Sequence, residues 1–188
     1  DRASQLVRSF KQVAVDQSSE QRRAFRLREY LDEILLSLHP RIKKLRTEVD
    51  IDCDPDLVMD TYPGALYQII VNLVINSLVH AFDEQHSGRI GISALLSGDD
   101  VVIDYRDDGK GMPEAVLKRV FEPFFTTRRG SGGSGLGLHI VYNLATQVLG
   151  GSVTCDSTPG AGTHFRLVLP RLAPNLPGAA AEVVGGPQ

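Results

Sequence analysis

The sequence of 188 residues lacks three features that would each assign it to a class of protein. It has only two cysteines, Cys53 and Cys155, which lie far apart and without metal-ligand spacing. This argues against a disulfide scaffold, and we interpret both residues as buried or neutral thiols in a reducing compartment. The chain also has no excess of charge. Its net charge of −3 gives no global argument for a nucleic-acid partner, and we expect none.

Long hydrophobic runs are the third missing feature. No run approaches the length of a transmembrane span and no signal peptide opens the chain, so we expect no membrane contact by this chain. The composition, 42% apolar and 23% charged, is ordinary for a globular protein, and the length fits one full domain with an appendage. Because the chain starts at Asp1 within a helical pattern, we interpret it as part of something longer.

Two amphipathic patterns predict helices at the start of the chain. Residues 1 to about 20 carry one apolar stripe at helical spacing, and so short a helix needs a partner helix to bury that stripe. A polar linker is expected over 17–24, and a second helix begins near Leu27. We expect it to end near His39 and Pro40, because a proline disfavours helical geometry in the residue before it.

Alternation of apolar and polar residues predicts a set of strands. The first covers 47–53, where Val49, Ile51 and Cys53 share one face. The tail from Ala173 has the composition of a flexible segment. Further strands are expected over 57–59, 89–96, 101–106, 152–156 and 163–169, and further helices over about 63–82, 113–119 and 135–149.

The helix expected over 63–82 is mostly apolar but carries a polar stripe. Gln68, Asn72, Asn76 and His80 are spaced by four residues and therefore lie on one face. Burying an asparagine amide without a partner costs on the order of 1–3 kcal/mol, so the two asparagines need something polar to hold. Amide oxygens suit Mg²⁺, which prefers to share a site with phosphate. The alternative is an internal amide network.

A glycine-rich loop leads into the helix expected from about 135. Glycines let the backbone approach an anion, and a helix start offers unpaired N–H groups and the positive end of its dipole. Arg128 and Arg129 add cationic donors nearby. We therefore predict a phosphate site under a mobile lid, with a plain surface loop as the alternative.

Two common nucleotide motifs do not fit this loop. No lysine follows the glycines at the Walker spacing. The pattern Gly130-x-Gly132-x-x-Gly135, with Asp156 about 20 residues further on, matches the bare dinucleotide fingerprint. Its context is wrong, because the segment before it contains Pro123 and is not a clean buried strand.

The segment after the strand over 101–106 is the third polar feature. Asp107 ends the strand, and Gly109 and Gly111 allow close backbone approach. Such a carboxylate can accept a hydrogen bond from an exocyclic amine, as on adenine, and the alternative is a loop with two solvated aspartates. The aromatic cluster that begins at Phe121 either anchors the lid to the core or contacts a partner protein.

Taken in order, these segments resemble the sequence boxes of the GHKL ATPases. The F box favours the sensor histidine kinases over the gyrase, Hsp90 and MutL branches. Residues 72–76 resemble the N box, 107–111 the first glycine box (Asp-x-Gly-x-Gly), 121–125 the F box, 133–138 the second glycine box, and 160–165 the third.

The resemblance covers about residues 27 to 170 and implies the Bergerat fold. This is an α/β two-layer sandwich, in which helices cover one face of a mixed sheet and ATP lies between the helices and under the lid. The resemblance also implies three parts of the chain. Residues 1–22 would end a dimerisation and phosphoacceptor helix, 23–172 would form the ATP-binding catalytic domain, and 173–188 would form a flexible tail.

On the base side of the site, the resemblance implies that Asp107 receives the adenine amino group. Thr163 would support Asp107 through water. Gly111, in one box with Gly109, would let the ring lie close.

On the phosphate side, the resemblance implies that Asn76, with Asn72, holds Mg²⁺ and the phosphates. His80 would lie near the phosphates, and Arg128 would reach the terminal phosphate from the lid. The second glycine box would cradle the phosphate chain, at Gly133, Gly135, Leu136, Gly137 and Leu138.

By the same resemblance, the chain transfers phosphate rather than hydrolysing ATP. The hydrolytic branches carry a glutamate where this chain has Asn72, and an amide cannot take a proton from water. Transfer would be an in-line displacement on the γ-phosphorus, towards a histidine of a phosphoacceptor domain. None of the five histidines here precedes an acidic residue, so we expect no autophosphorylation by this chain alone.

The implied partners are the protein's own phosphoacceptor domain and a response regulator. The implied setting is the bacterial cytoplasm, with a parent protein that is a homodimer anchored in the membrane. Two alternatives remain. One is a GHKL serine kinase of the anti-sigma type, against which the F box and the N-terminal helix argue. The other is a nucleotide- or protein-binding module without catalysis.

Overall fold

The computed structural model describes residues 21–82, 88–127 and 135–175. Three of the predictions above fall wholly or mainly outside these residues. They are the helix over residues 1 to about 20, the lid segment with Arg128 and Gly133, and most of the C-terminal tail.

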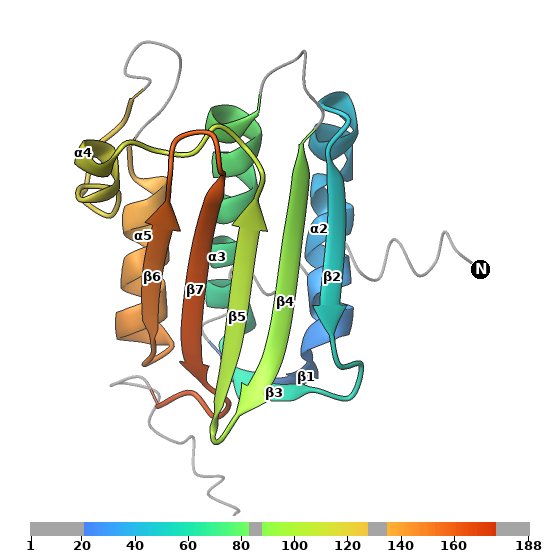
Figure 1. The fold of residues 1–188 in the computed structure, drawn as a ribbon. Helices are drawn as coiled ribbons and strands as arrows, with labels where there is room; N and C mark the ends of the chain where they lie inside the picture. Colours follow the sequence, from blue (N-terminus) through green and yellow to red (C-terminus); the bar gives the residue numbers. More distant parts are fainter. Residues whose placement is uncertain (1–20, 83–87, 128–134, 176–188) are drawn as a thin grey trace, which may run out of the picture.

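A five-stranded mixed sheet forms one layer of the molecule. Only its first pair of strands, β2 and β4, is parallel, and the other neighbours are antiparallel. Figure 1 shows the helices on one face of this sheet, which confirms the predicted two-layer sandwich. The order is β2 (Glu48–Cys53), β4 (Arg89–Ser97), β5 (Asp100–Asp107), β7 (Thr163–Pro170) and β6 (Ser152–Ser157).

Three helices form the second layer, and two of them end in a π-helical turn. The central one, α3 (Pro63–Asn76), continues as η1 (Ser77–Ala81) and is flanked by α2 (Leu27–Lys44). On its other side, α5 (Gly137–Asn143) continues as η2 (Leu144–Val148). A short helix, α4 (Glu114–Leu117), lies at the end of the sandwich near the β5 and β6 termini.

The core lies between the two layers. Alternate residues of β5 face the helices, so Val101, Ile103 and Tyr105 are fully buried. Leu66, Ile70 and other apolar residues of α3 are buried against them. The same alternation brings Asp107, the last residue of β5, to the inner side of the sheet.

One helix of the described residues, Pro63–Ala81, is long and apolar enough to cross a membrane, with a mean hydropathy of 1.4. The expectation that no segment approaches such a length was therefore wrong. In the structure 56% of this segment is buried inside the protein, as is typical of a core helix.

The helix α2 continues past Pro40, where we expected it to end. Proline lacks the N–H that would bond the carbonyl of Leu36, but Leu36 is 39% exposed, so water can satisfy this carbonyl. One further turn buries Ile42 against the core. Arg41, Lys43 and Lys44 then lie near the negative end of the helix dipole.

A second, two-stranded sheet was missed in part. Its strands β1 (Arg23–Arg26) and β3 (Val58–Thr61) pair antiparallel. β1 begins inside the segment that we expected to be a linker. It has only four residues, of which Phe25 alone is buried, so it is too short to show a period of two.

The chain remains attached to the domain beyond residue 172, where we expected the domain to end. Ala173 is 1% exposed and its N–H donates to the carbonyl of Asp60 at 2.9 Å. The hydroxyl of Tyr62 donates to the carbonyl of Pro174 at 3.0 Å.

Both cysteines are free, as the sequence predicts. Burial raises the pKa of Cys53, and it raises the pKa of Cys155 to about 12. Both thiols are therefore neutral at physiological pH.

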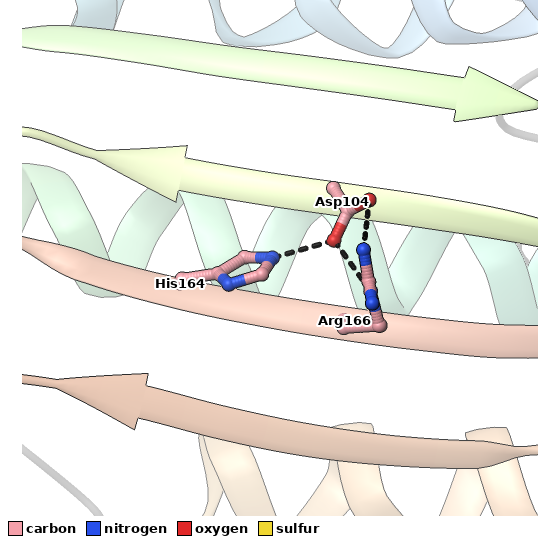
Figure 2. Close-up of polar contacts among 3 residues, drawn as sticks. All are labelled: Asp104, His164 and Arg166. Carbon is pink, nitrogen blue, oxygen red and sulfur yellow. Dashed lines mark hydrogen bonds and ion pairs between the residues drawn. The ribbon is translucent and has the colours of Figure 1, made fainter.

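The outer face of the sheet carries a compact ionic cluster (Figure 2). Arg166 on β7 donates two hydrogen bonds to Asp104 on β5, at 2.9 and 3.1 Å, and a ring nitrogen of His164 lies 2.5 Å from the same carboxylate. The Asp104 side chain is only 8% exposed, although it belongs to the face without helices. The Arg166 hydrogen bonds hold the pKa of Asp104 below its ordinary value.

We predict that Asp104→Asn lowers the free energy of unfolding at pH 7 by about 1–3 kcal/mol, because hydrogen bonds to a charged group are lost. Since the folded pKa is below the ordinary value of 3.8, this contribution is present above about pH 4. It disappears as the pH falls through the folded pKa.

Urea unfolding at pH 7 and near pH 3 measures this difference. Asp50→Asn is the control, because Asp50 has its carboxylate 75% exposed and makes only a 3.9 Å contact with Arg89. It should change stability by less than about 0.5 kcal/mol. An equal loss for Asp104→Asn at both pH values would contradict the prediction.

Candidate functional site

A pocket of about 530 Å³ opens at one end of the sandwich. There the end of α3 with η1 meets the end of β5 and the start of β7 (Figure 1). The start of α5 and the segment after β5 complete the walls. The predicted site residues that line it are Asn72, Asn76, His80, Asp107, Gly111, Gly135, Gly137, Leu138 and Thr163.

Four predicted site residues are not among those that line the pocket. Gly109 packs behind it, where a side chain would clash with Ala81. Leu136 lies next to the lining residues Gly135 and Gly137. Arg128 and Gly133 lie outside the described residues.

The carboxylate of Asp107 is held by donors from three separate segments. The Ser77 hydroxyl on η1 donates to Oδ2 at 2.6 Å. The N–H of Gly109 donates to Oδ1 at 3.1 Å, and the N–H of Thr163 on β7 donates to the same oxygen at 3.2 Å. Thr163 thus contacts Asp107 directly through its backbone, whereas the sequence led us to expect a water between them.

Burial raises the pKa of Asp107 above its ordinary value, although the hydrogen bonds from Ser77, Gly109 and Thr163 act in the opposite direction. The residue is 7% exposed. Its free acceptor capacity faces the pocket, because Asp107 is itself a lining residue. A buried, oriented acceptor of this kind suits a ligand that brings its own N–H donor.

Two glycines with positive φ allow the turn after β5 and the turn before β7 to touch. Gly111 (φ 66°) lies against the Thr158 carbonyl, and Gly162 (φ 78°) lies against the carbonyl of Asp107. A Cβ at either position would clash with these backbone atoms. The N–H of Gly160 donates to the carbonyl of Lys110 at 2.7 Å and closes the same contact.

The two asparagines line the opposite wall of the pocket. Nδ2 of Asn72 donates to the carbonyl of Gln68 at 2.7 Å, which leaves Oδ1 as the acceptor. A methyl group at Gly137 would lie 3.0 Å from that Oδ1, so the N box and the start of α5 are in contact. Gln68 itself is exposed, is not a lining residue and has no direct part in the site.

The donor set fits a hard cation that is shared with a phosphate. Amide oxygens such as Oδ1 of Asn72 are neutral hard ligands. No group of three or more His, Cys, Asp or Glu in the described ranges is placed to hold a metal ion alone. A cation at this wall would therefore complete its coordination with ligand oxygens and water.

The sequence analysis missed the apolar wall of the pocket. Its residues come from the segment between the turn after β5 and the lid. Val116 and Val120, four residues apart, were a signal for one apolar face there, and Phe125 was interpreted only as an anchor of the lid. The missed lining residues are Ile75, Val79, Ala81, Lys110, Met112, Pro113, Val116, Val120, Phe125, Thr126 and Thr127.

A histidine ties the F box to α5. One ring nitrogen of His139, Nδ1, lies 3.0 Å from the carbonyl of Phe121, and Nε2 lies 3.0 Å from Nδ2 of Asn143. Both contacts are satisfied by a neutral ring that donates from Nδ1 and accepts at Nε2. Phe121 also packs against Tyr142 on α5, with ring centroids 5.6 Å apart.

Asp108 does not point into the pocket. Its Oδ1 accepts a hydrogen bond from the Arg89 N–H at 2.7 Å, at the start of β4. Its charge is therefore directed away from the wall formed by Asn72 and Asn76.

Comparison with known proteins places these features in a family. The profile described as histidine kinase-, DNA gyrase B- and HSP90-like ATPase matches residues 61–173. Sensor kinase CckA of Brucella abortus is 33% identical over 174 residues, which are 81% of this chain and 18% of that protein. Sensor histidine kinase ZraS of Salmonella typhimurium is 39% identical over 112 residues, which are 59% of this chain and 23% of that protein. The chain thus spans about a fifth of the length of these two relatives.

Solved structures show the same fold. The nucleotide-free catalytic domain of histidine kinase ThkA superposes with a TM-score of 0.71 at 24% identity, over 81% of this chain and 97% of that one. Histidine kinase ThkA in complex with response regulator protein TrrA gives a TM-score of 0.67 at 22% identity, over 90% of this chain and 48% of that one.

We predict that Asp107→Asn stabilises the protein at neutral and alkaline pH. Because the folded pKa of Asp107 is raised above 3.8, this group contributes fully to stability below about pH 4 and loses its contribution as the pH rises through the folded pKa. The asparagine keeps the shape without the charge. Its Tm should exceed that of the wild type by a few degrees at pH 8, and the difference should vanish towards pH 4.

Thermal melts from pH 4 to pH 8 test this, with Asp56→Asn as the control, because Asp56 is an exposed turn residue. A lower Tm for Asp107→Asn at pH 8 would refute the expectation.

Proposed function

Because the chain belongs to the histidine kinase-, DNA gyrase B- and HSP90-like ATPase family, we propose that it is the catalytic domain of a sensor histidine kinase that binds Mg·ATP. It passes the γ-phosphate to a histidine of a phosphoacceptor domain. The observation that carries the proposal is the single pocket in which the two asparagines of α3 face the buried Asp107.

The two walls of the pocket divide the nucleotide between them. On one wall, Asp107 accepts the amino group of adenine, and the apolar side chains of Met112, Val116 and Val120 cover the ring. Gly111 and Thr163 line the same wall and leave room for the base.

On the other wall, Asn76 and Asn72 hold the phosphates. Mg²⁺, when bound between these amides and the phosphates, neutralises charge on the reacting group. His80 and the second glycine box, at Gly135 and Gly137, lie along the phosphate chain. Arg128 and Gly133 complete this wall from the lid, by their resemblance to the family alone.

The same wall accounts for transfer rather than hydrolysis. Asn72 is an amide whose Nδ2 donates to the Gln68 carbonyl, so it cannot remove a proton from water. ATP bound here is kept for an acceptor that supplies its own nucleophile, which is the phosphoacceptor histidine. The phosphate then passes to a response regulator, and the complex of histidine kinase ThkA with TrrA supports a partner of that kind.

The surrounding protein is proposed from the relatives. Residues 1–22 are the end of a phosphoacceptor helix, 23–172 form the ATP-binding domain, and a tail follows. The parent protein is a bacterial homodimer, anchored in the membrane, with this domain in the cytoplasm.

We predict that a non-hydrolysable ATP analogue binds this chain with an affinity that depends on Mg²⁺, and that Asn76→Ala lowers this affinity at least about tenfold, because a ligand of the cation and phosphates is lost. Calorimetric titration with and without Mg²⁺ measures both effects. Gln68→Ala is the matched control, because Gln68 lies two turns earlier on the same helix face but outside the pocket. Unchanged affinity for Asn76→Ala would count against the proposed wall.

We further predict phosphotransfer in trans. With [γ-³²P]ATP, the chain alone should remain unlabelled, whereas addition of a phosphoacceptor domain should give an acid-labile label on that domain. Asn76→Ala should abolish this label. Labelling of the chain itself on an acid-stable residue would favour a serine kinase, and nucleotide binding without any transfer would favour a binding module.

A further inference from the structure

A serine that the sequence analysis passed over lies directly behind the base side of the pocket. Ser77 is the first residue of η1 and is fully buried. Its hydroxyl donates to Oδ2 of Asp107 at 2.6 Å. It does not line the pocket, so it acts on a ligand only through the carboxylate.

A tyrosine sets the direction of this hydrogen bond. The hydroxyl of Tyr105 is fully buried on β5, 2.9 Å from Oγ of Ser77 and 3.2 Å from the carbonyl of Leu73. Burial raises the pKa of Tyr105 far above its ordinary value, so the hydroxyl keeps its proton and remains a donor. Ser77 therefore accepts from Tyr105 and gives its own proton to Asp107.

The hydrogen-bond count then identifies the atom that is left for a ligand. An ionised carboxylate offers about four acceptor positions, two on each oxygen. Both positions on Oδ1 are used by the N–H groups of Gly109 and Thr163. One position on Oδ2 is used by Ser77, so the remaining position lies on the oxygen that the serine holds.

We propose that Ser77 and Tyr105 are positioning residues of the nucleotide site, which fix Oδ2 of Asp107 as the acceptor for the 6-amino group of a purine. This rests on the proposed function, because it specifies the base that the site takes. A 6-oxopurine would place a carbonyl oxygen against the same carboxylate oxygen and would be repelled. The relay thus contributes to selection of 6-aminopurines.

The test compares two ligands that differ only in this amino group. ADP and purine riboside 5′-diphosphate, which has hydrogen in place of the 6-amino group, are titrated calorimetrically into the chain with Mg²⁺ present. The wild type should prefer ADP by about tenfold, the size expected of one hydrogen bond to a charged group. Ser77→Ala should lose most of this preference through weaker ADP binding, with the affinity for the analogue unchanged within about twofold.

Two further variants separate positioning from structure. Tyr105→Phe keeps the ring in the core and removes only the first donor, so the preference should fall by about threefold. It also decides the case if Ser77→Ala fails to fold. Ser37→Ala is the control, because the Ser37 hydroxyl likewise bonds a helix carbonyl, that of Ile34 at 2.6 Å, in the distant helix α2.

The outcomes distinguish the two proposals. Equal weakening of both ligands by Ser77→Ala or Tyr105→Phe would show a merely structural role and overturn the inference. A preference that is unchanged in both variants would overturn it too. A wild type that binds ADP and the analogue equally would overturn the inference while leaving nucleotide binding intact. A wild type that binds neither would instead remove the proposed function itself.

Discussion

One buried carboxylate joins the two layers of this protein at the pocket. Asp107 ends the central strand β5, and its donors come from η1 in the helical layer, from the turn that follows, and from β7. The sheet and the helix are thereby connected through a polar group in an otherwise apolar interface. Desolvation makes an ionised carboxyl expensive at this place, and only the set of three donors keeps it oriented. The site therefore depends on a group that works against the stability of the fold around it, a combination common at functional sites.

The glycines of the site act through contact between backbones. Gly111 and Gly162 bring the turns before and after β6 and β7 against each other, and Gly109 packs on Ala81 at the end of η1. The N–H of Lys110 donates to the carbonyl of Ala81 at 3.1 Å, which ties the same turn to the helix. A side chain at any of these glycines would separate elements that together form the base side of the pocket. The glycine boxes therefore shape the wall as much as they contact the nucleotide.

Most of the fold could be predicted from the sequence, because a half-buried strand and a core helix each leave a clear period. The five strands of the main sheet and the polar stripe of α3 were found in this way. β1 could not be found, since one buried residue in four makes no pattern. The continuation of α2 through Pro40 depends on the exposure of Leu36 and the burial of Ile42, which are tertiary facts. Within the site, Asp107 and the asparagines are visible because polar residues interrupt apolar runs. Ser77 is small and follows Asn76 directly, so only the fold shows that it reaches the carboxylate.

The π-helical turn has a consequence for how this chain tolerates length changes. In η1 the N–H of Phe82 bonds the carbonyl of Ser77, five residues back, so the turn holds one residue more than an α-helical turn would. Removing one residue between 78 and 81 would let the segment relax to an α-helix and rotate everything after it by roughly 100° about the axis. Ala81 would then no longer meet the turn after β5. Insertions and deletions that most helix ends absorb would be excluded here, so the spacing between Asn76 and Phe82 is as constrained as the identity of the residues themselves.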